Sequence, residues 1–381
     1  MALELTEEQK AAGWQVHNIG DLGEIFDGPH ATAKKLEHGP YYLSISSLVD
    51  GRLILSESAH ISEEDYSKWT RRVTPQAGDL LFSYETKLGS VALMPEGIRA
   101  SLGRRMGLIR FDTEKADNRY MLYKWLSLGF QTYIEQNKIS GATVDRIPLT
   151  ELGKWEVVLP PLAEQKRIAE ILGSVDDKIE ANSRLIEKLT RLIDLQVEQA
   201  HRTASGTLKI SDLAVHSKAQ ILPSKSTDAS VLHYSLPAFD LGMVAAEEEA
   251  EAILSNKFIL SEPAVLFSKL NPGTPRIWMV EPAQEKYSFA STEFVVLQPK
   301  EGIGLGTLWA ACRDSRVTRR LIELARGTST SHQRVSPQDI LDSEVVLPDI
   351  PEAEAELIRQ LIVQNNSLVK TRYLLIRHLI G

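Results

Sequence analysis

The sequence predicts an α+β protein in which two modules alternate with two long helices. The helices are expected to pair as an antiparallel intramolecular coiled coil, with an approximate twofold relation between the modules. Three observations lead to this fold class: an internal repeat, a heptad stripe of apolar residues from position 168 to 196, and short strand-like runs bounded by turn residues. Each module should be a mixed, mainly antiparallel β domain with helices.

The repeat is clearest where a strand-like run meets a proline. Residues 156–160 read EVVLP, and residues 344–348 read the same five letters, an offset of 188. Further matches keep the same order at offsets of 185 to 191, among them the letters LFS at 81–83 and 266–268. A repeat that covers nearly the whole chain indicates a duplicated unit. The predicted domains are residues 1–160, helix 161–202, residues 203–348 and helix 349–381.

The first long helix carries one residue of its stripe every three or four positions. Pro160 and Pro161 cannot continue a helix from upstream, so they set its start. Alternating steps of four and three are typical of coiled-coil a and d positions, which require a partner helix. Asn182 lies within the stripe, where it either fixes the register or marks a hydrated gap. The predicted packing positions here are Ile168, Leu172, Val175, Ile179, Asn182, Ile186, Leu189 and Ile193.

The second helix repeats this pattern near the end of the sequence. Leu361, Leu368 and Leu375 recur at steps of seven, and Asn365 lies among them. Two such helices in one chain can bury each other's apolar stripes, and a module between them favours the antiparallel arrangement. Forty helical residues span about 60 Å, so the pair would be a rigid spacer between the modules.

The composition indicates a soluble globular protein. The chain has 381 residues, of which 43% are hydrophobic and 25% charged, and no apolar run reaches membrane-spanning length. The first residues are charged and lack the apolar region of a secretory signal, and the single Cys312 excludes an intramolecular disulfide framework. We therefore expect a cytoplasmic protein. The formal net charge of −8 argues mildly against a nucleic-acid partner, although a local basic face is compatible with it.

No catalytic motif is recognisable. The sequence lacks a P-loop, an HExxH zinc motif and a GxSxG nucleophile elbow. The run GIGLG at 302–306 is not a dinucleotide fingerprint, and NPGTP at 271–275 is interpreted as a turn. We therefore expect no catalytic residue, no metal and no cofactor on this chain.

The segment LPPLAEQKRIAEIL at 159–172, preceded by SGATVDRI at 140–147 and repeated downstream, resembles the specificity (S) subunit of type I restriction-modification systems. The resemblance covers essentially the full chain and is most specific at residues 157–172. The second copy, LPDIPEAEAELIRQLI, keeps the Leu-Pro and the apolar spacing but lacks Gln165 and the Lys166–Arg167 pair of the first.

The resemblance implies a noncatalytic role. Each module would be a target-recognition domain for one half of a bipartite, asymmetric double-stranded DNA site. Two methyltransferase (modification) subunits would dock on the helices, and restriction (translocase-nuclease) subunits would complete the complex. S-adenosylmethionine, ATP and Mg²⁺ would be bound by those partner subunits.

Side chains that read bases are expected on loops between strands. Tyr84, Lys87 and Lys269 are favoured because they follow the repeated LFS. Arg146 and Arg334 are favoured by their equivalent positions, although a shared structural ion pair explains these equally well, and any of the cations can be simply solvated. The candidates are Arg71, Arg72, Tyr84, Lys87, Arg104, Arg105 and Arg146 in the first module, and Lys225, Lys269, Asn271, Arg276, His332, Gln333 and Arg334 in the second.

Three other hypotheses stay open at this stage. The chain could be an enzyme fragment, such as part of a nuclease or methyltransferase, or a protein-interaction scaffold without DNA contact. The partner could also be one fused restriction-methylation polypeptide instead of separate subunits.

Overall fold

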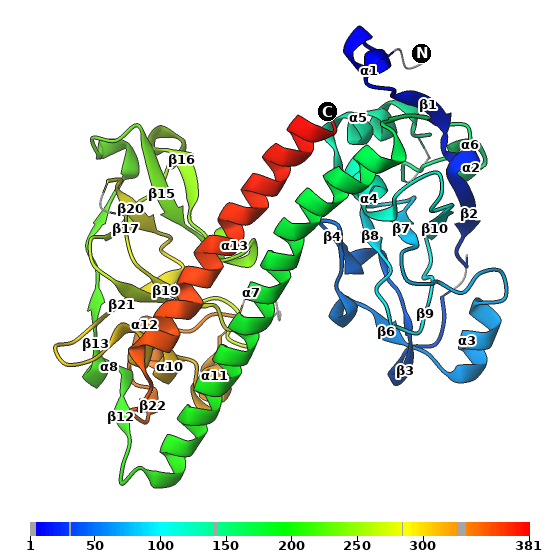
Figure 1. The fold of residues 1–381 in the computed structure, drawn as a ribbon. Coiled ribbons are helices and arrows are strands. Elements are labelled where there is room, and N and C mark those ends of the chain that lie inside the picture. The colour runs from blue at the N-terminus through cyan, green and yellow to red at the C-terminus, as the bar shows by residue number, and fades with distance from the viewer. Residues whose placement is uncertain (1–4, 30–31, 141–143, 284, 327–332) are drawn as a thin grey trace. The chain divides into compact units, whose positions relative to one another are not determined.

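A computed structural model describes residues 5–29, 32–140, 144–283, 285–326 and 333–381 (Figure 1). The chain divides into two compact units: unit 1 comprises Met1–Asp177 with Lys370–Gly381, and unit 2 comprises Lys178–Val369. Each unit therefore contains a stretch of both long helices, α7 (Leu162–Thr203) and α13 (Glu352–Leu379). The domain ranges drawn from the sequence treat each helix as a separate spacer, and they stay a prediction.

Unit 1 is built on a four-stranded antiparallel sheet in the order β2-β10-β7-β8. Its strand β7 is completely buried and carries the repeated LFS, with Phe82 opposite Gly107. The bounds are β2 Gly23–Asp27, β7 Leu80–Ser83, β8 Val91–Leu93 and β10 Met106–Phe111.

Shorter strands and helices surround this sheet. Strand β3 pairs antiparallel with β6 and parallel with β9, while β1 pairs with β11 and β4 with β5. The strands are β1 Gln15–Asn18, β3 Leu36–Tyr42, β4 Leu48–Val49, β5 Arg52–Leu53, β6 Ala59–His60, β9 Ala100–Ser101 and β11 Glu156–Leu159. The helices are α1 Glu7–Ala11, α2 Ile19–Leu22, η1 Ile45–Ser47, η2 Leu55–Glu57, α3 Glu63–Trp69, α4 Asn118–Leu126, α5 Leu128–Asn137 and α6 Leu149–Leu152.

Unit 2 contains a four-stranded sheet in the order β13-β21-β18-β19 and a five-stranded sheet in the order β14-β17-β20-β15-β16. Strands β12 and β22 form a separate pair. The strands are β12 Leu208–Lys209, β13 Ala214–Ser217, β14 Gln220–Ile221, β15 Ser230–Tyr234, β16 Ala246–Glu249, β17 Lys257–Leu260, β18 Ala264–Ser268, β19 Ile277–Val280, β20 Ser288–Ala290, β21 Phe294–Pro299 and β22 Glu344–Val345. The helices are α8 Ile210–Leu213, η3 Pro223–Lys225, α9 Leu236–Asp240, η4 Ala250–Ala252, α10 Leu305–Cys312, α11 Ser315–Leu324 and α12 Pro337–Leu341.

The two units repeat one topology, which confirms the internal repeat. The order β2-β10-β7-β8 corresponds to β13-β21-β18-β19, and LFS lies on β7 and β18, the equivalent strands. Side chains repeat their contacts as well. The hydroxyl of Ser83 donates to Glu85 O at 2.8 Å, and that of Ser268 donates to Leu270 O at 3.1 Å. The sequence match therefore reflects equivalent strands and turns.

In unit 1, the first turns of α7 pack against the last turns of α13. Ile168 and Leu172 share an apolar cluster with Ile376 and Ile380. Further along α7, the Asp176 carboxylate accepts a hydrogen bond of 2.8 Å from Arg372. Contacts that advance along α7 thus move backward along α13, so the helices are antiparallel here.

In unit 2, the later turns of α7 pack against the first turns of α13 with the same polarity. Asn182 is 2% exposed and donates to Asn365 Oδ1 at 2.9 Å and to Gln364 Oε1 at 2.8 Å. Ile193 lies further along α7 and shares a cluster with Ile358, which precedes Asn365. The antiparallel pairing in each unit confirms the predicted fold class, and the buried amide layer favours a register-fixing role for Asn182 over a hydrated gap.

The predicted stripe on α7 differs in burial along its length. Ile168, Leu172, Ile179, Asn182 and Ile193 are buried. The remaining predicted positions on this helix are partly buried, namely Val175, Ile186 and Leu189. In α13, Leu361 is buried, and Leu368 and Leu375 are partly buried. Other residues of α7 are also buried, namely Gln165, Ala169, Gly173 and Val197. Ala169 and Val197 belong to the apolar clusters of their own units.

The first turn of each long helix also contacts the beginning of a helix in its own unit. Gln165 of α7 accepts from the backbone N–H of Asp117, the residue that caps α4, at 3.0 Å. Glu352 of α13 accepts from the N–H groups of Gly306 at 2.7 Å and Thr307 at 2.8 Å, in the first turn of α10. The second sequence copy lacks the glutamine, but Glu352 provides the corresponding acceptor.

Lys124 on α4 is a partly buried charge whose effect on stability can be tested. Burial lowers its pKa from 10.5 to about 8. Below pH 8 the charged lysine costs stability, and stability rises between pH 8 and 10.5 because the unfolded chain then binds more protons. We expect Lys124→Met to stabilise unit 1 at pH 7 by about 1 kcal/mol, allowing for partial exposure. Urea unfolding at pH 7 and pH 10 should show this gain shrinking at the higher pH, and an equal gain at both would contradict this explanation.

Candidate nucleic-acid interface

The end of β7 in unit 1 gathers four of the predicted DNA-binding residues. Ile147 N–H donates to Tyr84 O at 2.9 Å, which places Arg146 beside the turn that follows β7. Lys87 is exposed in that turn, and Arg146 is exposed next to it. Arg105 forms an ion pair with Glu85 at 3.1 Å and donates to Thr86 Oγ1 at 2.9 Å. The turn thus presents Lys87 and Arg146 to solvent while Arg105 stabilises it.

Tyr84 has a supporting position in this group. Its side chain is 5% exposed, and its hydroxyl interacts with the Asp27 carboxylate. Burial, followed by the negative charge of Asp27, raises the pKa of Tyr84 well above its usual value. The tyrosine therefore positions Asp27 and is not itself exposed for base contact.

Unit 2 places its own candidates at the equivalent end of β18. Val335 N–H donates to Lys269 O at 3.0 Å, as Ile147 does to Tyr84 in unit 1. Asn271 has a φ of 51° and its N–H donates to Gln333 O at 2.8 Å. Arg334 is exposed and donates to Glu293 Oε1 at 3.0 Å. Lys269, Asn271, Gln333 and Arg334 therefore lie together, with Arg334 structurally equivalent to Arg146.

The remaining unit 2 candidates are Arg276, Lys225 and His332, and Arg276 lies opposite the end of β18, where Ser268 N–H donates to Arg276 O at 3.0 Å. Arg276 is held by Asp240 through two hydrogen bonds of 2.7 and 3.0 Å, which engages its guanidinium. Lys225 is exposed at the end of η3. His332 lies outside the described residues.

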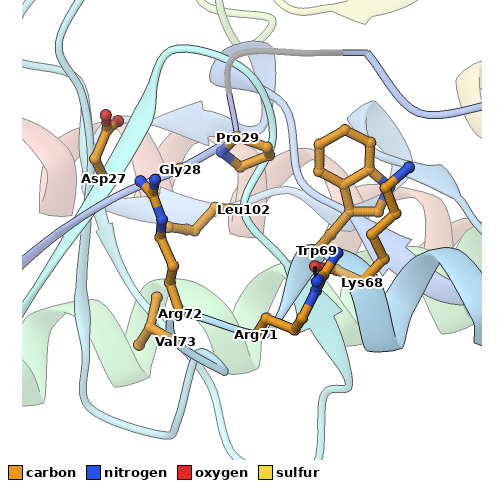
Figure 2. A pocket seen from close by; sticks show the side chains of 9 residues that line it. All are labelled: Asp27, Gly28, Pro29, Lys68, Trp69, Arg71, Arg72, Val73 and Leu102. Atoms are coloured by element: carbon orange, nitrogen blue, oxygen red, sulfur yellow. Dashed lines mark hydrogen bonds between the residues drawn. The ribbon is translucent and has the colours of Figure 1, made fainter.

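A second basic site in unit 1 lies around a pocket of about 570 Å³ that follows α3, called here the Trp69 pocket. Figure 2 shows the side chains of Lys68, Arg71 and Arg72 around this pocket, with Trp69 at its edge. The Lys68 ammonium lies 5.5 Å from the centroid of the indole ring. Sequence reasoning selected the two arginines but missed Lys68 and Trp69. The signal was present in the run KWTRR at 68–72, because aromatic side chains among cations are typical of nucleic-acid surfaces.

Arg104, the last predicted residue of unit 1, lines another pocket of unit 1, of about 240 Å³, with Lys35. Its backbone N–H donates to the Tyr42 hydroxyl at 3.2 Å, and its side chain is exposed. Basic side chains thus border both pockets of this part of unit 1.

Two absences hold for the described part of the chain. No helix there combines the length and the apolarity that a membrane span requires. Nor do the histidine, cysteine and carboxylate side chains of those residues gather into a group suited to hold a metal ion.

The fold and the sites define a class of protein with two repeated α+β units, each containing stretches of two long antiparallel helices. The S subunit of a type I restriction-modification system from M. genitalium has this fold, with a TM-score of 0.60 at 15% identity over 100% of this chain and 98% of that one. At that identity the likeness concerns the fold alone.

Sequence comparison finds similar proteins over the first half of the chain. Residues 11–191 match the family described as "Type I restriction modification DNA specificity domain". Two similar proteins of Methanocaldococcus jannaschii are the putative type I restriction enzyme MjaX specificity subunit, 28% identical over 190 residues, and the type I restriction enzyme MjaVIII specificity subunit, 26% identical over 186 residues. Each match covers 47% of this chain and 43% of the relative, so it spans less than half of either protein.

Proposed function

We propose that the chain is the DNA-specificity subunit of a type I restriction-modification complex and that each unit reads one half of a bipartite DNA site. One observation carries this proposal: the topology that includes the matched DNA specificity domain of residues 11–191 is present twice. A duplicated reader implies two half-sites in one recognition sequence.

The side chains at the two strand ends support an asymmetric site. Unit 1 presents Lys87 and Arg146 beside β7, whereas unit 2 presents Lys269, Asn271 and Arg334 beside β18. Arginine and lysine pair with guanine, and asparagine pairs with adenine, in the major groove. Because the donor and acceptor sets differ, the half-sites are expected to differ in sequence.

The helices are the proposed attachment for partners. Two methyltransferase subunits and the restriction subunits bind S-adenosylmethionine, ATP and Mg²⁺. This chain contributes DNA recognition and no catalytic group. An exposed apolar row on α7 supports docking, because Leu185, Leu192 and Leu195 are each at least 40% exposed. The complex is expected in the cytoplasm, where its DNA is.

The test is methylation sequencing of a strain that expresses this chain together with a type I methyltransferase subunit. We expect one modified motif that is present with both proteins and lost when this chain is deleted. A methyltransferase that modifies the same motif without the chain would contradict the proposal. Purified chain incubated with labelled S-adenosylmethionine and DNA should transfer no methyl group.

A further inference from the structure

We propose that the Trp69 pocket of unit 1 binds a DNA backbone phosphate together with its neighbouring deoxyribose. The pocket would then anchor the protein on DNA irrespective of base sequence, while the side chains beside β7 read the bases. This inference rests on the proposed function and goes further by separating the anchoring role from the reading role.

The pocket is shaped by a close backbone approach after β2. Gly28 N–H donates to Met106 O at 2.9 Å, and a Cβ at position 28 would lie only 2.5 Å from that oxygen. A side chain larger than glycine would therefore displace the pocket wall. Leu102 is 2% exposed and provides an apolar lining. The volume of about 570 Å³ is suited to a small organic group, here a sugar with its phosphate, and exceeds the need of a lone ion.

The cations around the pocket are available for an anion. Within the described residues, no carboxylate forms an ion pair with Lys68, Arg71 or Arg72, and the two arginines are exposed directly after α3 ends. By contrast, Arg99 nearby is paired with Glu63 of α3 at 2.7 Å. Unpaired guanidinium groups that flank a pocket are suited to bind a phosphate through paired hydrogen bonds.

Two further groups fit this ligand. The indole N–H of Trp69 is buried and has no acceptor among the described residues, so it is an unused donor at the edge of the pocket. The pocket also contains the Asp27 carboxylate, which is engaged by the Tyr84 hydroxyl. The positive charges therefore outnumber the negative charge at the pocket.

Unit 2 carries a different segment at the corresponding place. Strand β15 pairs with β16 and β20 as β3 pairs with β6 and β9, so the residues after β16 correspond to those after β6. Strand β16 itself reads AEEE, residues 250–256 after it read AEAILSN, and the next cation, Lys257, is 8% exposed and donates to Ser255 Oγ at 2.6 Å. The anchoring function should therefore belong to unit 1.

The experiment measures DNA affinity of the full chain assembled with its methyltransferase subunits, at several salt concentrations from 50 to 200 mM. Two duplexes are compared, one with the methylated motif and one with that motif scrambled. The test variant is R71A/R72A, and the matched control is Arg99→Ala, an exposed arginine of the same unit that is already paired. Trp69→Phe removes the indole N–H while keeping an aromatic ring.

For R71A/R72A we expect affinity to fall about tenfold per lost contact at 50 mM salt, equally for both duplexes, and the slope of log K against log salt to become less steep by about 0.9 per contact. Arg99→Ala should leave the slope unchanged. An unchanged slope for R71A/R72A overturns the inference, as does a loss confined to the motif duplex, which would make these arginines base readers. If the wild-type complex binds neither duplex, the proposed function itself fails.

A second arm separates DNA from a free phosphate ester as the occupant. Inorganic phosphate and dAMP are titrated against the wild-type complex and R71A/R72A. We expect neither compound at 1 mM to displace DNA. Binding of dAMP that is lost in R71A/R72A, together with an unchanged salt slope for DNA, would identify a nucleotide site and overturn the inference.

Discussion

Arg372→Met is expected to lower the free energy of unfolding of unit 1 by about 2 kcal/mol, because it leaves the partly buried Asp176 carboxylate and the exposed Asp50 carboxylate without their cation. Arg372 is 3% exposed, and its guanidinium donates to Asp176 Oδ1 at 2.8 Å and to the Asp50 carboxylate. Tyr123 donates to the other oxygen of Asp176 at 2.6 Å. Burial alone would lower the pKa of Arg372, but the two carboxylates outweigh it and raise that pKa. The arginine therefore joins α13 to both α7 and the turn between β4 and β5.

Hydrogen exchange distinguishes a destabilisation of unit 1 from a destabilisation of the whole chain. Amides of α4 in unit 1 should exchange faster in Arg372→Met, while those of α10 in unit 2 should change much less. Arg377→Met is the matched control, since Arg377 is exposed on the same helix. Arg372→Lys keeps the charge but not the planar fork and should lie between the two. Equal stability of the Arg372→Met and Arg377→Met proteins would show that the buried network does not hold α13 to unit 1.

Glu352→Ala is expected to destabilise unit 2 by about 2 kcal/mol, because it removes the acceptor at the start of α10. The Glu352 carboxylate accepts from Gly306 N, from Thr307 N and from the Thr307 hydroxyl at 2.6 Å. A Cβ at Gly306 would lie 2.4 Å from Ala355 Cβ, so α10 approaches α13 closely at this point. Loss of the acceptor would leave donors unsatisfied next to a tightly packed contact.

Glu352→Gln is the informative control, since unit 1 uses Gln165 in the corresponding role. One amide oxygen can replace only part of the carboxylate, so we expect Glu352→Gln to recover about half of the loss. Urea unfolding followed by the fluorescence of Trp309 in α10, with the other tryptophans replaced by phenylalanine, provides the measurement. If the Glu352→Ala protein is as stable as the starting protein, Glu352 does not cap α10.

The repeat and the long helices could be predicted from sequence because both depend on local patterns. A shared EVVLP and an apolar step of three or four residues are visible without any tertiary contact. The detailed burial could not be predicted in the same way. Val197 is buried because α7 packs against the body of unit 2 as well as α13, and a heptad pattern describes only the second of these neighbours.

The equivalence of candidate residues in the two units was predictable, but the contacts of each side chain were not. The equivalence of Arg146 and Arg334 follows from the repeat, and the structure places both beside the ends of equivalent strands. The partners of Tyr84 and Arg276 are distant in sequence, namely Asp27 and Asp240, so their engagement was not visible. The same holds for Arg372, whose carboxylate partners come from two other segments.

The most direct test of two readers held at a fixed separation is the sequence of the methylated motif itself. Single-molecule methylation sequencing of cells that contain this chain and its methyltransferase reports every modified site at once. We predict two unlike half-sites separated by an unspecified gap of constant length. A single uninterrupted motif, or two half-sites whose gap varies from site to site, would contradict this account.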